Sequence, residues 1–131
     1  MNMKGKVAIV AGGARDIGRA ISSKLAAVGA KVVVNFNNSK AEAEETVAAI
    51  LASGGTAIAV AGDMTKQADV ENLVNKTRAA YGEKIDVLVN VVGGMVARKT
   101  LEEMDQEFFE WVMRLNVTSA FLTSKFVTPY M

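Results

Sequence analysis

The chain has 131 residues, a length that suits one domain, and half of them are hydrophobic, enough to form a core. Its net charge of +1 creates no basic field to attract nucleic acid, so we expect no nucleic-acid partner. The absence of cysteine excludes a disulfide scaffold and thiolate chemistry. Histidine is absent too, which removes the commonest metal ligand and proton shuttle, and no metal site is predicted.

The N-terminal residues, MNMKGKVAIV, enter an apolar run too early to hold a signal peptide. No apolar run in the chain approaches the length of a membrane span. We therefore expect a cytoplasmic protein without a membrane partner.

Residues 6–21, KVAIVAGGARDIGRAI, contain an apolar run, a glycine turn and an amphipathic pattern, in that order. Residues 7–11 predict a strand, and Gly12 with Gly13 predicts the turn. The helix that follows has an apolar face made by Ile17, Ile21, Leu25 and Val28. A strand, a glycine turn and a helix typically begin a dinucleotide-binding fold, because unpaired N–H groups at the helix start suit a pyrophosphate. A strand-turn-helix with glycines for packing only is the alternative for this stretch taken alone.

The spacing of the glycines separates several nucleotide-binding motifs. Gly12 and Gly18 lie six residues apart, a longer turn than the common fingerprint with glycines at positions one, three and six. Gly13 and Gly18 have the spacing of a phosphate loop, but Arg-Ala follows Gly18 where that loop needs Lys and then Ser or Thr. The phosphate loop is therefore excluded. Asp16, between the glycines, is expected to cap the first helix.

Short apolar runs alternate with helical patterns along the rest of the chain. Further strands are predicted over residues 32–34, 57–61 and 85–89, and helices over 39–53, about 66–81 and about 106–128, with Ser39 and Asp105 as N-caps. The strands are apolar throughout and joined by helices, which indicates a parallel sheet covered on both faces with right-handed crossovers. The predicted fold class is α/β, a Rossmann-type doubly wound parallel sheet in three αβα layers, as one domain over residues 1–131.

The predicted helices differ in how many apolar faces they carry. The second and third have one face each, made by Ala43, Val47, Ile50 and Leu51 and by Val70, Leu73, Val74 and Thr77. The last helix has two stripes, Phe108, Val112, Leu115, Leu122 and Phe126 in one and Phe109, Met113, Val117, Ala120 and Val127 in the other. A surface helix needs only one apolar face. The second stripe is therefore expected to meet another subunit, to be covered by a missing C-terminal half, or to lie beneath the loop 94–104.

Polar or glycine-rich loops follow each predicted strand: residues 12–18, 35–38, 63–64 and 90–94. In an open parallel sheet such loops meet at the carboxyl ends of the strands, where ligands bind. An NAD site usually places an acid about 20 residues beyond the glycines, to hold the ribose hydroxyls. Residues 35–38, Asn-Phe-Asn-Asn, contain no acid. The sequence therefore favours NADP(H) over NAD(H).

Residues 11–18, AGGARDIG, resemble the motif of the short-chain dehydrogenase/reductase family, Thr-Gly, three residues, Gly, any residue, Gly. Ala11 stands in place of the Thr and Asp16 in place of the middle Gly. Asn90-Val91-Val92-Gly93 resembles the family's Asn-Asn-Ala-Gly, without its second Asn and its Ala. Asp63 with Met64, and Asn116 in the last helix, match further family positions. Four matches in the right order identify the chain as a member of this family over its whole length.

The resemblance implies a role for each matched residue. The implied cofactor-binding residues are Gly12, Arg15, Ile17, Gly18, Asn37, Asp63, Met64, Asn90, Val92 and Gly93. Asp63 would contact the adenine ring, Met64 would make a backbone contact, and Arg15 with Asn37 would lie near the 2′-phosphate. Asn116 is the implied catalytic residue, which stabilises a local helix distortion and helps hold a water of the proton relay. Taken singly, Asp63 could cap a turn, Asn90 could end a strand, Asn116 could pack in an interface and Arg15 could be a solvated charge.

The implied activity is an NADP(H)-dependent oxidoreductase that moves a hydride between the cofactor and a small-molecule carbonyl or alcohol. The GGARDIGRAI stretch and the 35–38 loop look most like 3-oxoacyl-(acyl carrier protein) reductases, which makes a 3-oxoacyl thioester the implied substrate class. The resemblance also implies a homo-oligomer, a dimer or tetramer, assembled through the last helix.

Family members are about twice as long, and their catalytic Ser, and their Tyr with a Lys four residues on, come beyond residue 131. Here Tyr81 is followed four residues later by Ile85, and Tyr130 by no such Lys. We therefore expect a fold that is apparently truncated after its fourth helix, holds the cofactor half, and is inactive alone. The alternative is a non-catalytic nucleotide-binding or assembly module.

Overall fold

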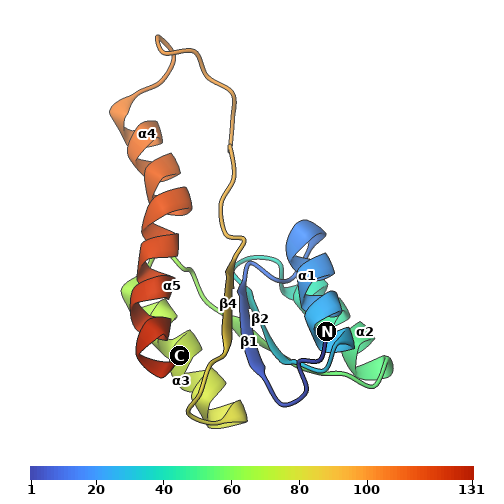
Figure 1. The fold of residues 1–131 in the computed structure, drawn as a ribbon. Coiled ribbons are helices and arrows are strands. Elements are labelled where there is room, and N and C mark those ends of the chain that lie inside the picture. The colour runs from blue at the N-terminus through green and yellow to red at the C-terminus, as the bar shows by residue number, and fades with distance from the viewer.

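A parallel sheet of four strands forms the middle layer of the computed structural model, which describes all 131 residues (Figure 1). The strand order is β3-β2-β1-β4. The central strands are β1 (Val7–Ala11) and β2 (Lys31–Phe36), and the edge strands are β3 (Thr56–Ala61) and β4 (Val87–Asn90). The predicted doubly wound parallel sheet is confirmed.

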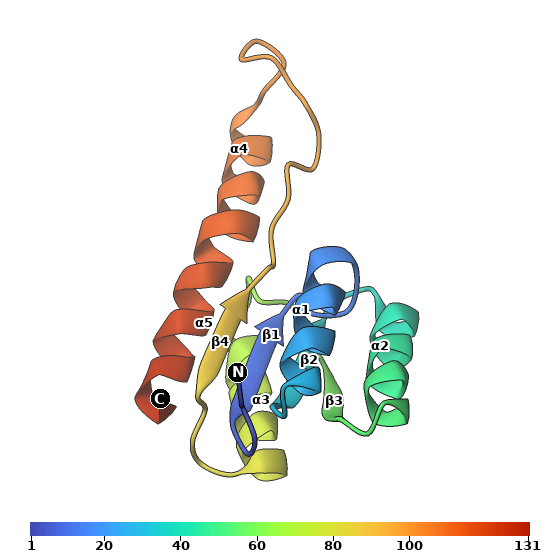
Figure 2. The same cartoon turned by 45° about the vertical axis from the view of Figure 1, so that its right-hand side comes forward.

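Helices cover both faces of the sheet, as its apolar strands predict (Figure 2). On one face, α1 (Asp16–Ala27) and α2 (Lys40–Ala52) share a buried cluster with alternate residues of the central strands. On the other face, α3 (Gln67–Tyr81) and α5 (Ser119–Val127) enclose the remaining strand residues. Every residue of β1 is buried because both of its faces meet a helical layer.

The buried face of α1 differs from the predicted one. It consists of Gly18, Ser22 and Ala26, while Ile21 and Leu25 are half-buried at its margins. Ile17, predicted to lie in the core, has 70% of its surface exposed. Small side chains let α1 lie close to the sheet, and this close approach turns Ile17 outward.

The buried residues of α3 agree with the prediction, and those of α2 agree only in part. All four predicted core residues of α3 are buried, which confirms that face. On α2, Leu51 was predicted to be buried but is 53% exposed, and Thr46 is buried instead. The Thr46 Oγ1 donates to Ala14 O at 2.7 Å and accepts from Arg19 Nε at 2.7 Å. These bonds satisfy the buried hydroxyl of Thr46 and join α2 to α1 and to the turn before it.

The last predicted helix forms one long rod with a local distortion. It consists of α4 (Gln106–Met113), a π-helical turn (Arg114–Thr118) and α5, followed by a short 3₁₀ turn (Thr128–Tyr130). The predicted N-cap is confirmed, since the Asp105 carboxylate accepts a hydrogen bond from Phe108 N at 2.8 Å. α5 packs against α3, whereas α4 and the loop before it project beyond the sheet (Figure 1).

The two apolar stripes of the rod separate only in part. Val127, predicted in the second stripe, is buried among apolar residues of α3 and the sheet, while Ala120 is half-buried. The exposed apolar row is Phe109, Met113, Val117 and Phe121. Phe121 joins it because the π-helical turn shifts the helical phase of the residues that follow.

At the edge of the sheet, β4 pairs only with β1, and its outer edge has no strand beside it. No helix combines the length and the apolar character that a membrane crossing needs. No cluster of acidic side chains is arranged to hold a metal ion.

Candidate functional site

A crevice of about 560 Å³ lies at the carboxyl ends of the strands. The loops that line it follow β1, β2, β3 and β4 and are far apart in the sequence. All predicted cofactor residues except Asn90 line this crevice: Gly12, Arg15, Ile17, Gly18, Asn37, Asp63, Met64, Val92 and Gly93. The fold therefore brings the loops singled out in the sequence together around one cavity.

Asn90 lies at the end of β4 but does not line the crevice. Its Oδ1 accepts a hydrogen bond from Thr123 Oγ1 at 2.7 Å. Thr123 is a buried residue of α5, so this bond ties the strand end to the helix. In this structure Asn90 therefore fixes the end of β4 against α5, outside the crevice.

Three glycines let backbone segments meet at the floor of the crevice. Gly12 has a φ of +79°, and a Cβ there would lie 3.1 Å from Val92 N. A Cβ on Gly18 would lie 1.9 Å from Gly12 O, and one on Gly93 would lie 2.5 Å from Asn116 Oδ1. These close approaches leave no room for side chains, which is typical of a loop that receives a phosphate-bearing ligand.

Asp16 was expected to cap α1, and this prediction is wrong. The N-cap position belongs to Arg15, and no side chain caps the helix start. The backbone of Asp16 has a φ of +50°, and its side chain is 87% exposed. The left-handed backbone directs the carboxylate into solvent, where Asp16 Oδ2 lies 4.0 Å from Arg15 Nε. Aspartate tolerates this conformation better than most residues, which explains how it can stand where the motif has glycine.

Asp63 forms a turn and also lines the crevice. Its Oδ1 accepts hydrogen bonds from Thr65 N at 2.9 Å and Thr65 Oγ1 at 2.7 Å, so the turn-capping alternative also holds. Burial acts to raise the pKa of Asp63, but the Thr65 hydrogen bonds and the charges of Lys66 and Arg114 outweigh it and lower that pKa. Asp63 is therefore a carboxylate, and an acceptor, at neutral pH.

Asn116 joins the last helix to the loop after β4. Its Nδ2 donates to Gly94 O at 2.8 Å and to Val112 O at 2.9 Å, and its Oδ1 accepts from Gly94 N at 2.9 Å. The residue lies within the π-helical turn, the kind of local helix distortion that the resemblance implies. Asn116 does not line the crevice, but its side chain fixes Gly94 directly beside Gly93, which does.

The crevice includes four residues outside the loops predicted from the sequence: Ser39, Gly62, Trp111 and Leu115. Ser39 and Gly62 lie directly beside the predicted loops 35–38 and 63–64, so only the loop bounds missed them. No signal in the sequence marks Trp111 and Leu115, since only the placement of α4 and of the π-helical turn against the loop after β4 brings them to this cavity.

Comparison with known proteins gives a consistent result. The family model described as short chain dehydrogenase matches residues 6–131. A 3-oxoacyl-[acyl-carrier-protein] reductase of Synechocystis is 42% identical over 127 residues, 96% of this chain and 50% of its own length. A short-chain dehydrogenase/reductase homolog of Bacillus subtilis, YusS, is 43% identical over 69% of this chain and 82% of its own length.

Among solved structures, a short chain dehydrogenase of Burkholderia cenocepacia in complex with NADP is 32% identical. It superposes with a TM-score of 0.93 over 100% of this chain and 53% of its own. The chain thus spans about half the length of the Synechocystis and Burkholderia proteins.

The contact between Gly18 and Gly12 predicts the effect of a single methyl group. Gly18→Ala would place a Cβ against backbone that cannot move aside, so we expect a loss of roughly 1–3 kcal/mol in the free energy of unfolding. Gly94→Ala is the matched control, because no atom lies within 4 Å of its Cβ position, and it should change that free energy by less than about 0.5 kcal/mol. Urea denaturation measures both. Equal midpoints for Gly18→Ala and the wild type would contradict the close approach.

Proposed function

The chain belongs to the short chain dehydrogenase family, and from this premise we propose that it is the cofactor-binding part of an NADP(H)-dependent oxidoreductase. A bound nicotinamide cofactor supplies or accepts the hydride, and a small-molecule carbonyl or alcohol is the other reactant. The observation that carries the proposal is the crevice at the carboxyl ends of the strands, which brings the glycine turn, Asp63 and the loop after β4 together.

The residues present fit a dinucleotide. A volume of about 560 Å³ lies in the usual range for small-molecule sites. The pyrophosphate would lie against the turn Gly12–Gly18, where the first turn of α1 offers backbone N–H groups and glycines leave space. The adenosine would lie between Asp63 with Met64 and the π-helical turn that carries Leu115. The ionised carboxylate of Asp63 suits the exocyclic amine of adenine as a hydrogen-bond acceptor.

The charges around the crevice support NADP(H) as the cofactor. Arg15 is the one cationic side chain among the lining residues. The loop after β2 contributes Phe36, Asn37 and Asn38, and none of them would repel a 2′-phosphate. We infer that Arg15 and Asn37 hold that phosphate.

The cofactor preference can be measured by titrating NADPH and NADH into the intact protein. The intrinsic fluorescence of Trp111, the sole tryptophan, reports binding because this residue lines the crevice. NADPH should bind more tightly, and Arg15→Ala should weaken NADPH about tenfold, the effect of losing a charged hydrogen bond. The affinity of Arg15→Ala for NADH should stay within about twofold of the wild type, because NADH has no 2′-phosphate for Arg15 to contact.

Lys24→Ala is the control for this measurement, because it removes a cation of the same sign from the last turn of the same helix. It should leave the affinity for NADPH unchanged. Equal affinity for NADPH in the wild type and Arg15→Ala would remove Arg15 from the site. Tighter binding of NADH would overturn the preference itself.

The substrate class is proposed as a 3-oxoacyl thioester, from the likeness to the Synechocystis reductase. Within the chain, Asn116 is the residue proposed to support catalysis. Its side chain is fully engaged with Gly94 and Val112, so it holds the loop and the π-helical turn in place. A carbonyl released from regular helical bonding by that turn could then hold a water of the proton relay.

A protein that consists of residues 1–131 alone should show no catalytic turnover of NADPH and a carbonyl substrate. A positioned general acid contributes roughly 10²- to 10⁴-fold, and this stretch offers none in the crevice. Tyr81 ends α3 away from the crevice, and burial raises the pKa of its hydroxyl, the opposite of what an acid at neutral pH needs. Steady NADPH oxidation with ketones and 3-oxoacyl thioesters is the measurement. Turnover by a protein of verified mass would reveal a catalytic group outside this account. In a longer active form, Asn116→Ala should slow turnover.

A second candidate function is a nucleotide-binding or assembly module without catalysis. The match to YusS supports this candidate. The matched region makes up 82% of the length of YusS, so this relative consists mostly of the part that the two chains share. The intact mass of the purified protein, compared with its full reading frame, distinguishes the two functions.

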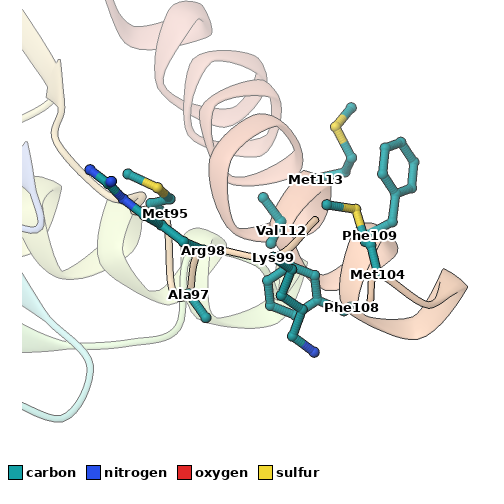
Figure 3. Close-up of a pocket in the computed structure, with 9 residues that line it drawn as sticks. All are labelled: Met95, Ala97, Arg98, Lys99, Met104, Phe108, Phe109, Val112 and Met113. Atoms are coloured by element: carbon teal, nitrogen blue, oxygen red, sulfur yellow. The ribbon is translucent and has the colours of Figure 1, made fainter. Parts of the chain in front are cut away.

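The exposed apolar row along α4, the π-helical turn and α5 supports a homo-oligomer. Phe109, Met113, Val117 and Phe121 are all exposed, and α4 buries no residue. The loop 94–104 does not cover this row. It encloses a hollow of about 700 Å³ beside α4, and Phe109 and Met113 are among the residues that line this hollow and remain exposed (Figure 3). Burying each large apolar side chain stabilises by roughly 1.5–3 kcal/mol, so we propose that a second copy covers the row.

Light scattering across a dilution series tests this assembly. The wild type should have a mass above that of one chain, and the double variant Phe109→Asp, Phe121→Asp should reduce it to one chain. Leu51→Asp is a matched control, because Leu51 on α2 and Phe109 are both 53% exposed, and it should assemble like the wild type. A wild-type monomer that melts cooperatively would contradict the proposed interface.

A further inference from the structure

Asn35 is a buried amide at the centre of the sheet's carboxyl edge. It lies in β2, next to Val34 in the core, and only 1% of its surface is exposed. A buried amide is costly unless its donors and acceptor are satisfied, so its partners show what holds it there.

The Asn35 side chain bonds to the strands on both sides of β2. Its Oδ1 accepts from Gly12 N at 3.2 Å, in the turn after β1. Its Nδ2 donates to Val60 O at 3.3 Å and to Gly62 O at 3.1 Å, at the end of β3. Its backbone O also accepts from Gly13 N at 3.0 Å. Asn35 thus links the glycine turn after β1 to the loop after β3, and both loops line the crevice.

The partners leave a single orientation for this amide. The oxygen must face the Gly12 N–H, and the nitrogen must face two carbonyls. An aspartate has the same shape and could accept from Gly12, but as an anion it has no donor for Val60 O and Gly62 O. A buried carboxyl beside two carbonyl oxygens has a raised pKa, because its charged form is desolvated and unpaired.

We propose that Asn35 is the positioning residue of the nucleotide site. It locks the turn that would hold the pyrophosphate to the Gly62–Met64 loop that would hold the adenosine, so that the crevice keeps its shape before a ligand binds. The inference rests on the proposed nucleotide-binding function. Because the side-chain donors and acceptor are engaged with backbone groups, Asn35 acts through Gly12 and Gly62 and not by holding the ligand itself.

Asn35→Asp tests the inference, with Thr77→Val as the matched control. Thr77 is also fully buried, but its hydroxyl bonds only to Leu73 O within α3. At about pH 8, Asn35→Asp should weaken NADP⁺ binding about tenfold or more, since the carboxylate cannot donate. Near pH 5.5 the protonated carboxyl regains one donor, and the affinity should return to within about threefold of the wild type. Thr77→Val should bind like the wild type at both pH values.

The wild type and its variants have the same other titratable groups near the Asn35 side chain. They are Asp63 and Asp69 in the loop and helix start after β3, and Arg15 and Asp16 in the turn after β1. The 2′-phosphate of NADP⁺ titrates as well. Comparison with the wild type at each pH cancels these contributions and isolates the new carboxyl.

Backbone amide exchange gives a second measurement that needs no nucleotide. In Asn35→Asp at about pH 8, the amides of Gly12 and Gly13 should exchange about fivefold or more faster than in the wild type, while Thr77→Val leaves them unchanged. If Asn35→Asp does not fold, Asn35→Ser takes its place, because its hydroxyl can satisfy one side but not both. That variant should show the same two defects without the recovery at low pH.

The outcomes separate the two proposals. Wild-type exchange rates at Gly12 and Gly13, or unchanged NADP⁺ affinity in a folded variant, would overturn the positioning role. A wild type that fails to bind NADP⁺ would overturn the proposed function, whereas faster exchange at Gly12 and Gly13 in the variant would still support Asn35 as the residue that positions the turn.

Discussion

The backbone of α1 rests directly on the turn that precedes it. Any Cβ on Gly18 would lie 1.9 Å from Gly12 O, so the contact requires glycine at position 18. The small residues Ser22 and Ala26 continue the same close approach along the helix. As a result, the first turn of α1 and the loop around Val92 meet at one cavity, and the crevice depends on this contact.

Side-chain amides hold the crevice together where the sheet's own hydrogen bonds end. Asn35 spans the gap from β1 to β3, and Asn116 joins the loop after β4 to the last helix. In both cases one amide bonds to both donors and acceptors of the backbone. The loops around a ligand site can therefore be irregular in conformation and still be held in place.

Two surfaces of the molecule differ in chemical character. The crevice gathers conformationally demanding glycines and polar side chains at the carboxyl edge of the sheet. The α4 rod projects beyond that edge and carries large apolar side chains that no other element of the chain covers. The first surface is the one proposed above to bind a nucleotide, and the second is the one proposed to meet a second copy of the chain.

The amino-acid sequence by itself determined the order of the elements, the parallel sheet and the loops that form the crevice, because apolar runs, glycine turns and helix caps act locally. It also determined the buried face of α3, whose residues recur at helical spacing. Only the tertiary structure decided that Ser22 and Ala26, not Ile17, face the sheet, that Asp16 points to solvent, and that Asn90 bonds to α5. These outcomes depend on how closely segments distant in the chain approach one another, and spacing along a sequence does not contain that distance.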